Sequence, residues 1–80
     1  MNRVEVRLHA SLERIRPGLK AGEALPLELK EGTTVERMVE ALGIPKKGIH
    51  LILINGTTRS LDHPLSDGDR VALFPPVGGG

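Results

Sequence analysis

The group in this chain that is best placed to react is the carboxylate of its last residue, Gly80. Residues 74–80 read Phe-Pro-Pro-Val-Gly-Gly-Gly, so a strand-like run gives way to two prolines and then to three glycines. Glycine has no side chain to pack and loses more backbone entropy on ordering than any other residue, so such a segment contributes little to a fold. We therefore expect the Gly80 carboxylate to be a reactive end; a frayed terminus without function is the alternative.

No other residues form a recognisable catalytic set. The three histidines, His9, His50 and His63, lie on different predicted elements and lack the spacing with carboxylates that a metal site needs. Asp67 and Asp69 could be an acid pair, but they belong to a Ser-Asp-Gly-Asp run, where the hydrogen bonds of a turn explain them better. We expect no metal site and no catalytic residue, so the chain is predicted not to be an enzyme by itself.

Composition limits the class of protein. The chain has 80 residues, enough for one small domain, and it contains one phenylalanine but no other aromatic residue and no cysteine. The lack of cysteine excludes disulfides, and no apolar run reaches the ~20 residues of a membrane span, so we expect a cytoplasmic protein without a membrane partner. A net charge of +1 and a lack of stacking aromatics argue against nucleic-acid binding.

Alternation of apolar and polar residues predicts five strands. Residues 3–9 alternate strictly, as expected of a strand with one buried face, whereas residues 10–24 are predicted to be mostly irregular. The further predicted strands are 25–30, 49–54, 57–61 and 70–74. Pro26 either weakens the second strand or places it at an edge. The nearly continuous apolar run of the third strand predicts a central strand covered on both faces, followed by an Asn-Gly hairpin turn and a short edge strand.

One amphipathic helix is predicted over residues 34–42. Its apolar stripe follows helical spacing and comprises Val35, Met38, Val39 and Leu42. Thr33 and Glu36 have the spacing of a capping box, and Gly43 provides a left-handed stop. The basic run at 46–48 is interpreted as a solvated connector. One helix packed on a mixed sheet is an α+β architecture of two layers.

The last strand is predicted to carry a binding residue next to the tail. Its alternation directs Val71 and Leu73 inward and leaves Ala72 and Phe74 on the outer face. An outward aromatic residue matches the enrichment of aromatics in binding hot spots, so we expect Phe74 to anchor a partner. Packing of Phe74 in the core is the alternative.

The closing run, residues 61–80, resembles the corresponding part of the MoaD/ThiS family of ubiquitin-like sulfur carriers. Tails in that family read Phe-Pro-Pro-Val, one variable residue and Gly-Gly, and Gly78 fills the variable place here. The Asp-Gly-Asp turn at 67–69 belongs to the same resemblance, which covers essentially the whole chain and is closest to MoaD, the small subunit of molybdopterin synthase. It implies a ubiquitin-like β-grasp domain over 1–74, with about five strands on one helix, and a flexible extended tail over 75–80.

The resemblance implies that the chain is a co-substrate. An activating enzyme would use ATP and magnesium to adenylate Gly80, and sulfur from a persulfide would replace AMP to give a thiocarboxylate for molybdopterin-type cofactor synthesis. Gly78 and Gly79 would let the tail enter a narrow channel. Pro75 and Pro76 would project it from the body. The chain itself would bind no cofactor.

The resemblance also implies partners and a binding surface. The expected surface lies on the outer face of the first and last strands and comprises His9, Thr58, Phe74, Pro75, Pro76 and Val77. The implied partners are a ubiquitin-activating-like adenylating enzyme and a large catalytic subunit similar to that of molybdopterin synthase, or another sulfur acceptor. The free protein is expected to be a monomer. The alternatives are a ubiquitin-like modifier joined to lysines through Gly80, a carrier for a thiamine, tungsten-related or other pathway, and a plain interaction module.

Overall fold

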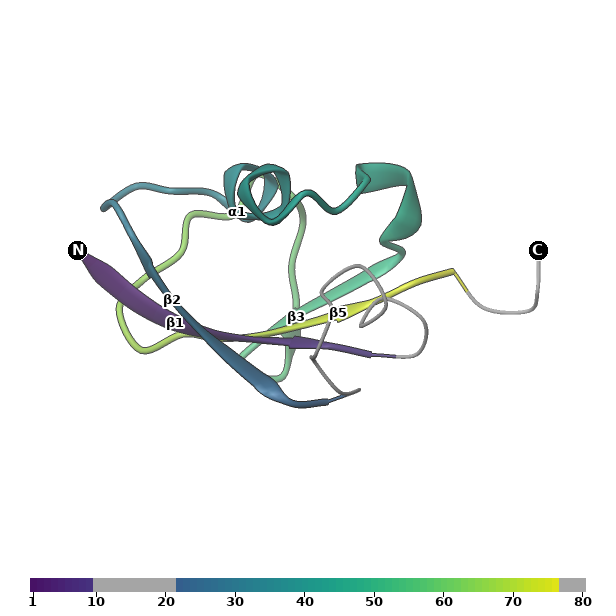
Figure 1. Cartoon of the computed structure of the whole chain (residues 1–80), viewed down its shortest axis with the longest axis horizontal. Helices are drawn as coiled ribbons and strands as arrows, with labels where there is room; N and C mark the ends of the chain where they lie inside the picture. Colours follow the sequence, from purple (N-terminus) through teal and green to yellow (C-terminus); the bar gives the residue numbers. More distant parts are fainter. Residues whose placement is uncertain (10–21, 77–80) are drawn as a thin grey trace.

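The computed structural model describes residues 1–9 and 22–76, which form two layers (Figure 1). Its elements are β1 (Asn2–Leu8), β2 (Ala24–Leu29), α1 (Val35–Leu42), the 3-10 helix η2 (Lys46–Gly48), β3 (Leu51–Ile54), β4 (Thr57–Thr58) and β5 (Arg70–Phe74). In the described part the strands form one mixed sheet in the order β2-β1-β5-β3-β4, and α1 lies across one of its faces. The predicted α+β fold with a ubiquitin-like arrangement is confirmed.

The first and last strands are parallel neighbours in the centre of the sheet. Val6 pairs with Val71 and Leu8 pairs with Leu73, while β2 and β3 flank this central pair in antiparallel orientation. The chain therefore leaves the sheet from a central strand. This pairing places the outer faces of the first and last strands side by side, as the expected binding surface requires.

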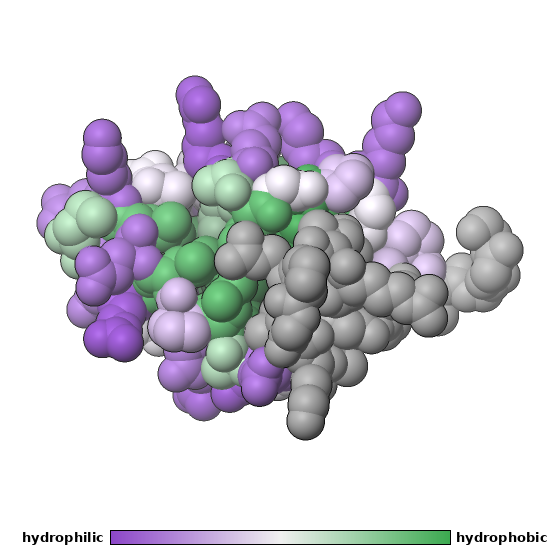
Figure 2. Space-filling view, viewed as in Figure 1, coloured by the Kyte–Doolittle hydropathy of each residue, from purple (hydrophilic) through white to green (hydrophobic). Residues whose placement is uncertain are grey.

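The core lies between α1 and the inward side chains of the sheet. Every hydrophobic residue in it is at most 7% exposed; its members are Val4, Val6, Leu8, Val35, Met38, Val39, Leu42, Ile44, Ile52, Ile54, Leu65, Val71 and Leu73. On the face drawn in Figure 2, a hydrophobic band lies between hydrophilic areas above and below it. Inward residues of β1 and β5 follow the predicted alternation, because side chains along a strand point alternately to opposite faces.

The start of α1 differs from the predicted capping box. Thr34 is the N-cap, and its hydroxyl oxygen accepts a hydrogen bond from the backbone N–H of Arg37 at 3.3 Å. Thr33 instead donates through its hydroxyl to the carbonyl of Lys30 at 2.6 Å. Glu36 accepts a hydrogen bond from the ammonium group of Lys46 at 3.0 Å. The Thr33–Glu36 capping box is therefore wrong, since the cap is one residue later and position 37 has no carboxylate.

Segment 61–65 also fixes α1. The carbonyl of His63 accepts a hydrogen bond from the N–H of Val35 at 3.0 Å, and the carbonyl of Leu61 accepts one from the N–H of Glu36 at 2.8 Å. These N–H groups belong to the first turn, which has no carbonyl partners within the helix. At the other end, Gly43 has a φ of 77°, the left-handed stop that was predicted.

Two strand predictions need correction. The apolar run predicted as a strand over 49–54 forms a strand only over Leu51–Ile54, and one of its faces is not covered by a helix. Leu51 and Leu53 are half-buried there, whereas Ile52 and Ile54 are in the core. The partner strand predicted over 57–61 is limited to Thr57–Thr58, because the chain then turns to reach the start of α1. Most of the segment predicted to be irregular, residues 10–21, lies outside the described residues.

Candidate functional site

The candidate site is the face of the sheet opposite α1, which we call the open face. Its side chains come from alternate positions of the strands and from the residue after β1; they are Arg3, Glu5, Arg7, His9, Ala24, Pro26, Glu28, Leu51, Leu53, Thr58, Arg70, Ala72 and Phe74. All of them are half-buried or exposed. The open face is charged near the start of β5 and mostly apolar near its end, where the chain leaves the sheet.

Phe74 lies at the apolar end and is held by a stacked histidine. The ring centroids of His9 and Phe74 are 4.4 Å apart and their planes differ by 8°. The backbone supports this contact, because the N–H of His9 donates to the carbonyl of Leu73 at 3.1 Å and the N–H of His50 donates to the carbonyl of Phe74 at 2.8 Å. Phe74 is half-buried and is not a member of the core, so the alternative of core packing is wrong.

Thr58 lies at the edge of the same face. It pairs with Leu53 across β3 and β4, and Leu53 pairs with Ala72 across β3 and β5. Thr58 is exposed and is separated from the central strand β5 by Leu53. The predicted surface residues Thr58, His9 and Phe74 therefore share one face, and their role in partner binding stays a prediction.

The first residues of the tail follow directly from β5. Pro75 is half-buried and Pro76 is exposed. Proline has a fixed φ and no backbone N–H, so neither residue can extend the hydrogen-bonded ladder of β5. Val77, Gly78, Gly79 and Gly80 lie outside the described residues, and the roles predicted for them stay predictions.

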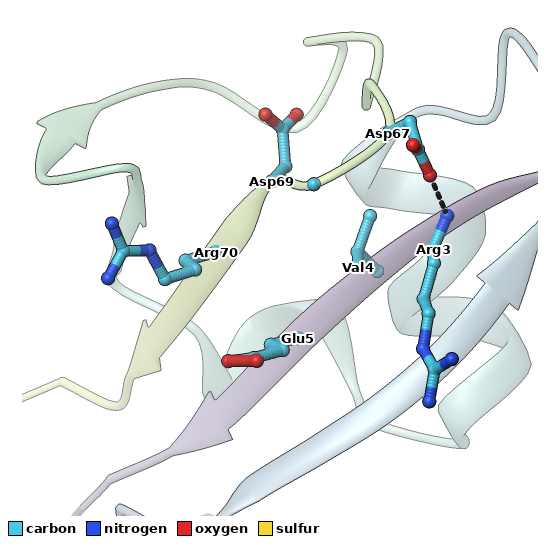
Figure 3. A pocket seen from close by; sticks show the side chains of 7 residues that line it. Arg3, Val4, Glu5, Asp67, Asp69 and Arg70 are labelled. Carbon is cyan, nitrogen blue, oxygen red and sulfur yellow. Dashed lines mark hydrogen bonds between the residues drawn. The ribbon is translucent and has the colours of Figure 1, made fainter.

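At the charged end, the turn at 67–69 is tied to the start of β1. The backbone N–H of Arg3 donates to the Oδ1 atom of Asp67 at 2.7 Å, and the N–H of Gly68 donates to the carbonyl of Arg3 at 2.8 Å. The N–H of Glu5 donates to the carbonyl of Asp69 at 3.0 Å. Figure 3 shows the Asp67 carboxylate directed at the Arg3 backbone. Asp67 therefore serves the fold.

Asp69 is a buried carboxylate with two donors. It is 9% exposed, and it accepts hydrogen bonds from the Nδ2 atom of Asn55 at 2.9 Å and from the backbone N–H of Ser66 at 2.7 Å. The side-chain oxygen of Asn55 accepts from the N–H of Arg70 at 3.0 Å. These bonds lock the β3–β4 hairpin turn to the start of β5. The interpretation of Asp67 and Asp69 as turn residues is thus favoured over an acid pair.

Two depressions hollow the open face near Arg70. The larger, about 460 Å³, is bordered by Arg3, Glu5, Asp67 and Arg70 (Figure 3). The smaller, about 240 Å³, lies on the other side of Arg70, beside Leu53 and Ala72. In the described ranges no group of three or more metal-ligating side chains is found.

The clearest electrostatic perturbation lies on the helix side, away from the open face. Hydrogen bonds to Glu36 and Glu40, at 3.0 and 3.4 Å, raise the pKa of Lys46 above its usual 10.5. Lys46 therefore pairs with the helix instead of extending freely as part of a basic connector.

No helix within the described ranges has the length and apolarity to cross a membrane.

Comparison with known protein families assigns the chain to a family. A family model described as Mut7-C ubiquitin matches residues 1–78. The chain belongs to the Mut7-C ubiquitin family. A stretch of 30 residues of this Mut7-C ubiquitin sequence is 63% identical to the molybdopterin synthase sulfur carrier subunit of Escherichia coli K12. That stretch spans 38% of the chain and only 37% of the curated relative.

Solved structures extend the similarity over nearly the whole Mut7-C ubiquitin chain. A putative molybdopterin converting factor subunit 1 from Pyrococcus furiosus superposes with a TM-score of 0.74 at 26% identity, over 96% of this chain and all of that one. SAMP1, a small archaeal modifier protein from Haloferax volcanii, gives 0.74 at 25% identity over 99% of this chain and all of that one. A complex of subunits 1 and 2 of the molybdopterin-converting factor from Helicobacter pylori gives 0.60 at 26% identity, over 98% and 99%. The predicted resemblance to MoaD-like proteins is confirmed.

Proposed function

We propose that this chain is a ubiquitin-like sulfur carrier whose Gly80 carboxylate is adenylated and converted to a thiocarboxylate. The sulfur would be used in molybdopterin-type cofactor synthesis. The observation that carries the proposal is the similarity to a sulfur carrier subunit, combined with the exit of the chain from the central strand β5. This chain supplies the carboxylate, and its partners supply the catalytic groups.

The geometry of the sheet suits such a carrier. Beyond Phe74, residues 75–80 can span at most ~20 Å when fully extended. A partner that docks on the open face therefore has the Gly80 carboxylate within reach of an active site ~20 Å away or less. Pro75 and Pro76 keep the tail from adding to the ladder of β5, and the glycines allow close approach to a nucleotide.

The chemistry needs a partner enzyme, ATP and magnesium. The Gly80 carboxylate attacks the α-phosphate of ATP, pyrophosphate leaves, and AMP becomes a good leaving group on the acyl carbon. The terminal sulfur of a persulfide then displaces AMP to give an acyl disulfide. A thiol attacks the other sulfur of that disulfide, forms a new disulfide with it and releases the thiocarboxylate. Two partners follow from this route: an adenylating enzyme and a large subunit that accepts the sulfur. The Helicobacter pylori complex of subunits 1 and 2 supports a partner of the second kind.

Intact mass measurement tests the proposal. The 80-residue chain is incubated with the adenylating enzyme of its own organism, ATP, magnesium and a persulfide donor. We expect the mass increase that corresponds to replacement of one oxygen by sulfur, and we expect none after deletion of Gly80. Gly79→Ala should slow the reaction more than Gly78→Ala, because position 78 is the variable place of the tail. A chain that gains no sulfur, or gains it equally without Gly80, overturns the proposal.

A second candidate is a modifier joined to target lysines through Gly80. The similarity to SAMP1 favours testing it, because the putative converting factor subunit 1 from Pyrococcus furiosus and the modifier match this chain with the same TM-score and nearly the same identity. Both fates begin with adenylation. In a cell extract, ATP-dependent adducts that require Gly80 would support the modifier, whereas the sulfur-for-oxygen mass change without adducts would support the carrier.

A further inference from the structure

Two arginines border the smaller depression on the open face. It has a volume of about 240 Å³ and is lined by Arg7, Leu53, Gly56, Arg70, Val71 and Ala72. Strand register explains its shape. Arg7 pairs with Ala72, and Ala72 pairs with Leu53, so the short alanine side chain lies between two longer ones. Gly56 adds no side chain at the hairpin end. The result is an apolar floor with a guanidinium group from each of two strands at its border.

The guanidinium groups are available for a ligand. Arg70 makes no side-chain hydrogen bond or ion pair with any residue in the described part of the chain. Arg7 is 40% exposed and, among the described residues, forms one ion pair, with Glu5 at 3.7 Å, a distance longer than a hydrogen bond. Figure 3 shows the Arg70 side chain extending away from Val4 and Arg3. Both groups therefore keep donors that can serve a carboxylate.

Arginine suits this task by its shape. Its planar guanidinium group presents parallel N–H donors that match the two oxygens of a carboxylate, and such charge-assisted bonds are stronger than neutral ones. A partly apolar surround lowers the effective dielectric and strengthens the interaction relative to water. Leu53 and Ala72 provide that surround here.

We propose that the depression between Arg7 and Arg70 binds the carboxylate of an aspartate or glutamate on a protein partner docked to the open face. The apolar neighbours of that acidic residue would contact Leu53 and Phe74. The proposal rests on the proposed function only for the identity of the partner, because the depression and its charges exist independently of any reaction at Gly80.

The surrounding charges favour a single carboxylate over a polyanion. The larger depression on the other side of Arg70 is bordered by Glu5, Asp67 and Asp69, and the whole chain has a net charge of only +1. A phosphodiester backbone has closely spaced negative charges and would meet these carboxylates. One side-chain carboxylate flanked by apolar residues meets two cations, and the acid beside them is the single carboxylate of Glu5, 3.7 Å from Arg7. Charge complementarity therefore selects an acidic protein segment.

Peptide titration followed by NMR tests this site. The ¹⁵N-labelled 80-residue chain is titrated with acetyl-Leu-Glu-Leu-amide, and with acetyl-Leu-Gln-Leu-amide as the neutral control of the same shape. We expect saturable shifts of the amide signals of Leu53, Gly56 and Ala72 with the acidic peptide, and about tenfold weaker binding of the neutral one, the effect of one charge-assisted hydrogen bond.

Matched variants assign the effect to the two guanidinium groups. Arg7→Gln and Arg70→Gln should each weaken the binding of the acidic peptide about tenfold, because each removes a charged donor. Arg3→Gln is the control, since Arg3 is on the same face and lines only the other depression. All three side chains are on the open face, so the variants are expected to fold, which their amide spectra report directly.

Three results would overturn the proposal. The first is equal affinity for the acidic and the neutral peptide. The second is a loss of affinity for the acidic peptide in Arg3→Gln as large as that in Arg7→Gln or Arg70→Gln. The third is the lack of a saturable shift of the amide signals at millimolar peptide. A single-stranded oligonucleotide that shifts the same signals more tightly than the acidic peptide would also overturn it, in favour of nucleic acid. The titration involves no adenylation or sulfur transfer, so its failure leaves the proposed reaction at Gly80 untouched, and the mass measurement leaves this site untouched.

Discussion

The two faces of the sheet differ in burial: one forms the core with α1, and the other is open to a partner. On the face covered by α1, Val6 and Leu73 have no exposed surface. On the open face, their immediate neighbours Arg7 and Phe74 are half-buried. The division has a period of two residues, so the same strands β1 and β5 supply both faces. Stability and recognition can therefore be changed separately by choosing between adjacent positions.

The open face itself has two unlike ends. Near the start of β5, the carboxylates of Asp67 and Asp69 fix the turn by accepting hydrogen bonds from the backbone N–H groups of Arg3 and Ser66. Near the end of β5, the stacked rings of His9 and Phe74 form the contact, and the chain continues into the tail. The first end is a closed polar network. The second is a half-buried aromatic pair that a partner can still cover.

Leu73→Ala against Phe74→Ala is the most direct test of the difference between the faces. Leu73→Ala removes a fully buried side chain and should lower the free energy of unfolding by about 2–5 kcal/mol. Phe74→Ala removes the stacking on His9, worth about 0.5–1.5 kcal/mol beyond the area that the half-buried ring covers, and should cost less than Leu73→Ala. Urea denaturation measures both. A loss with Phe74→Ala as large as that with Leu73→Ala would contradict the division between the faces.

Asn55→Asp tests whether the polar network stabilises the end of the sheet. The change replaces the Nδ2 donor with a second carboxylate beside the buried Asp69, and it should cost about 1–3 kcal/mol. Ser66→Ala is the control, because Ser66 serves Asp69 through its backbone N–H and the substitution keeps that bond. Thermal unfolding compares the two variants, and equal stability would show that the network contributes little.

Local patterns in the sequence predicted much of the fold. Strict alternation in β1 and β5 identified the inward residues, and the helical stripe from Val35 to Leu42 identified the face of α1 that packs on the sheet. These features depend on neighbours in the sequence. The apolar run before Asn55 was partly misjudged, because a strand with continuous apolar residues can have one half-exposed face when its sheet has a helix on one side only.

The contacts that depend on register could not be predicted from the sequence. The stack of His9 on Phe74 requires β1 and β5 to be parallel neighbours with Leu8 opposite Leu73. The bond between Asn55 and Asp69 requires the antiparallel register of β3 and β5. The Asn55-Gly56 pair indicates the hairpin turn. It does not indicate which carboxylate binds the Asn55 amide.

The N-cap of α1 is Thr34, one residue after the position that the sequence predicts. This difference provides a third test, on the side of the molecule that contains α1. Thr34→Ala should lower the free energy of unfolding by about 1 kcal/mol, because the Thr34 hydroxyl is the acceptor for the N–H of Arg37. Thr33→Ala removes only an exposed bond to the carbonyl of Lys30 and should cost less. Chemical denaturation of the pair measures the difference. If Thr33→Ala and Glu36→Ala together cost more than Thr34→Ala, the capping box would replace the cap at Thr34.

The smallest expected effect concerns the exposed ion pairs on the outer surface of the helix layer. Bonding to Glu36 and Glu40 raises the pKa of Lys46 in the folded state above 10.5, so the charged form is favoured by folding. The stabilisation is present in full below pH 10.5 and disappears as the pH rises through the raised folded-state pKa. Lys46→Gln should therefore be slightly less stable than the parent chain at neutral pH, and this difference should vanish in strongly alkaline solution.

Lys47→Gln is the matched control for that prediction, because Lys47 is the adjacent residue of η2 and makes no ion pair with the described residues. Its unfolding midpoint should follow that of the parent chain at every pH. High salt should shrink the Lys46→Gln difference as well, since exposed charges are screened. A difference that persists unchanged at high salt and above the raised pKa would mean that the Lys46 side chain stabilises α1 by packing of its methylene groups. The helix-covered side would then depend on apolar contact even at its exposed surface.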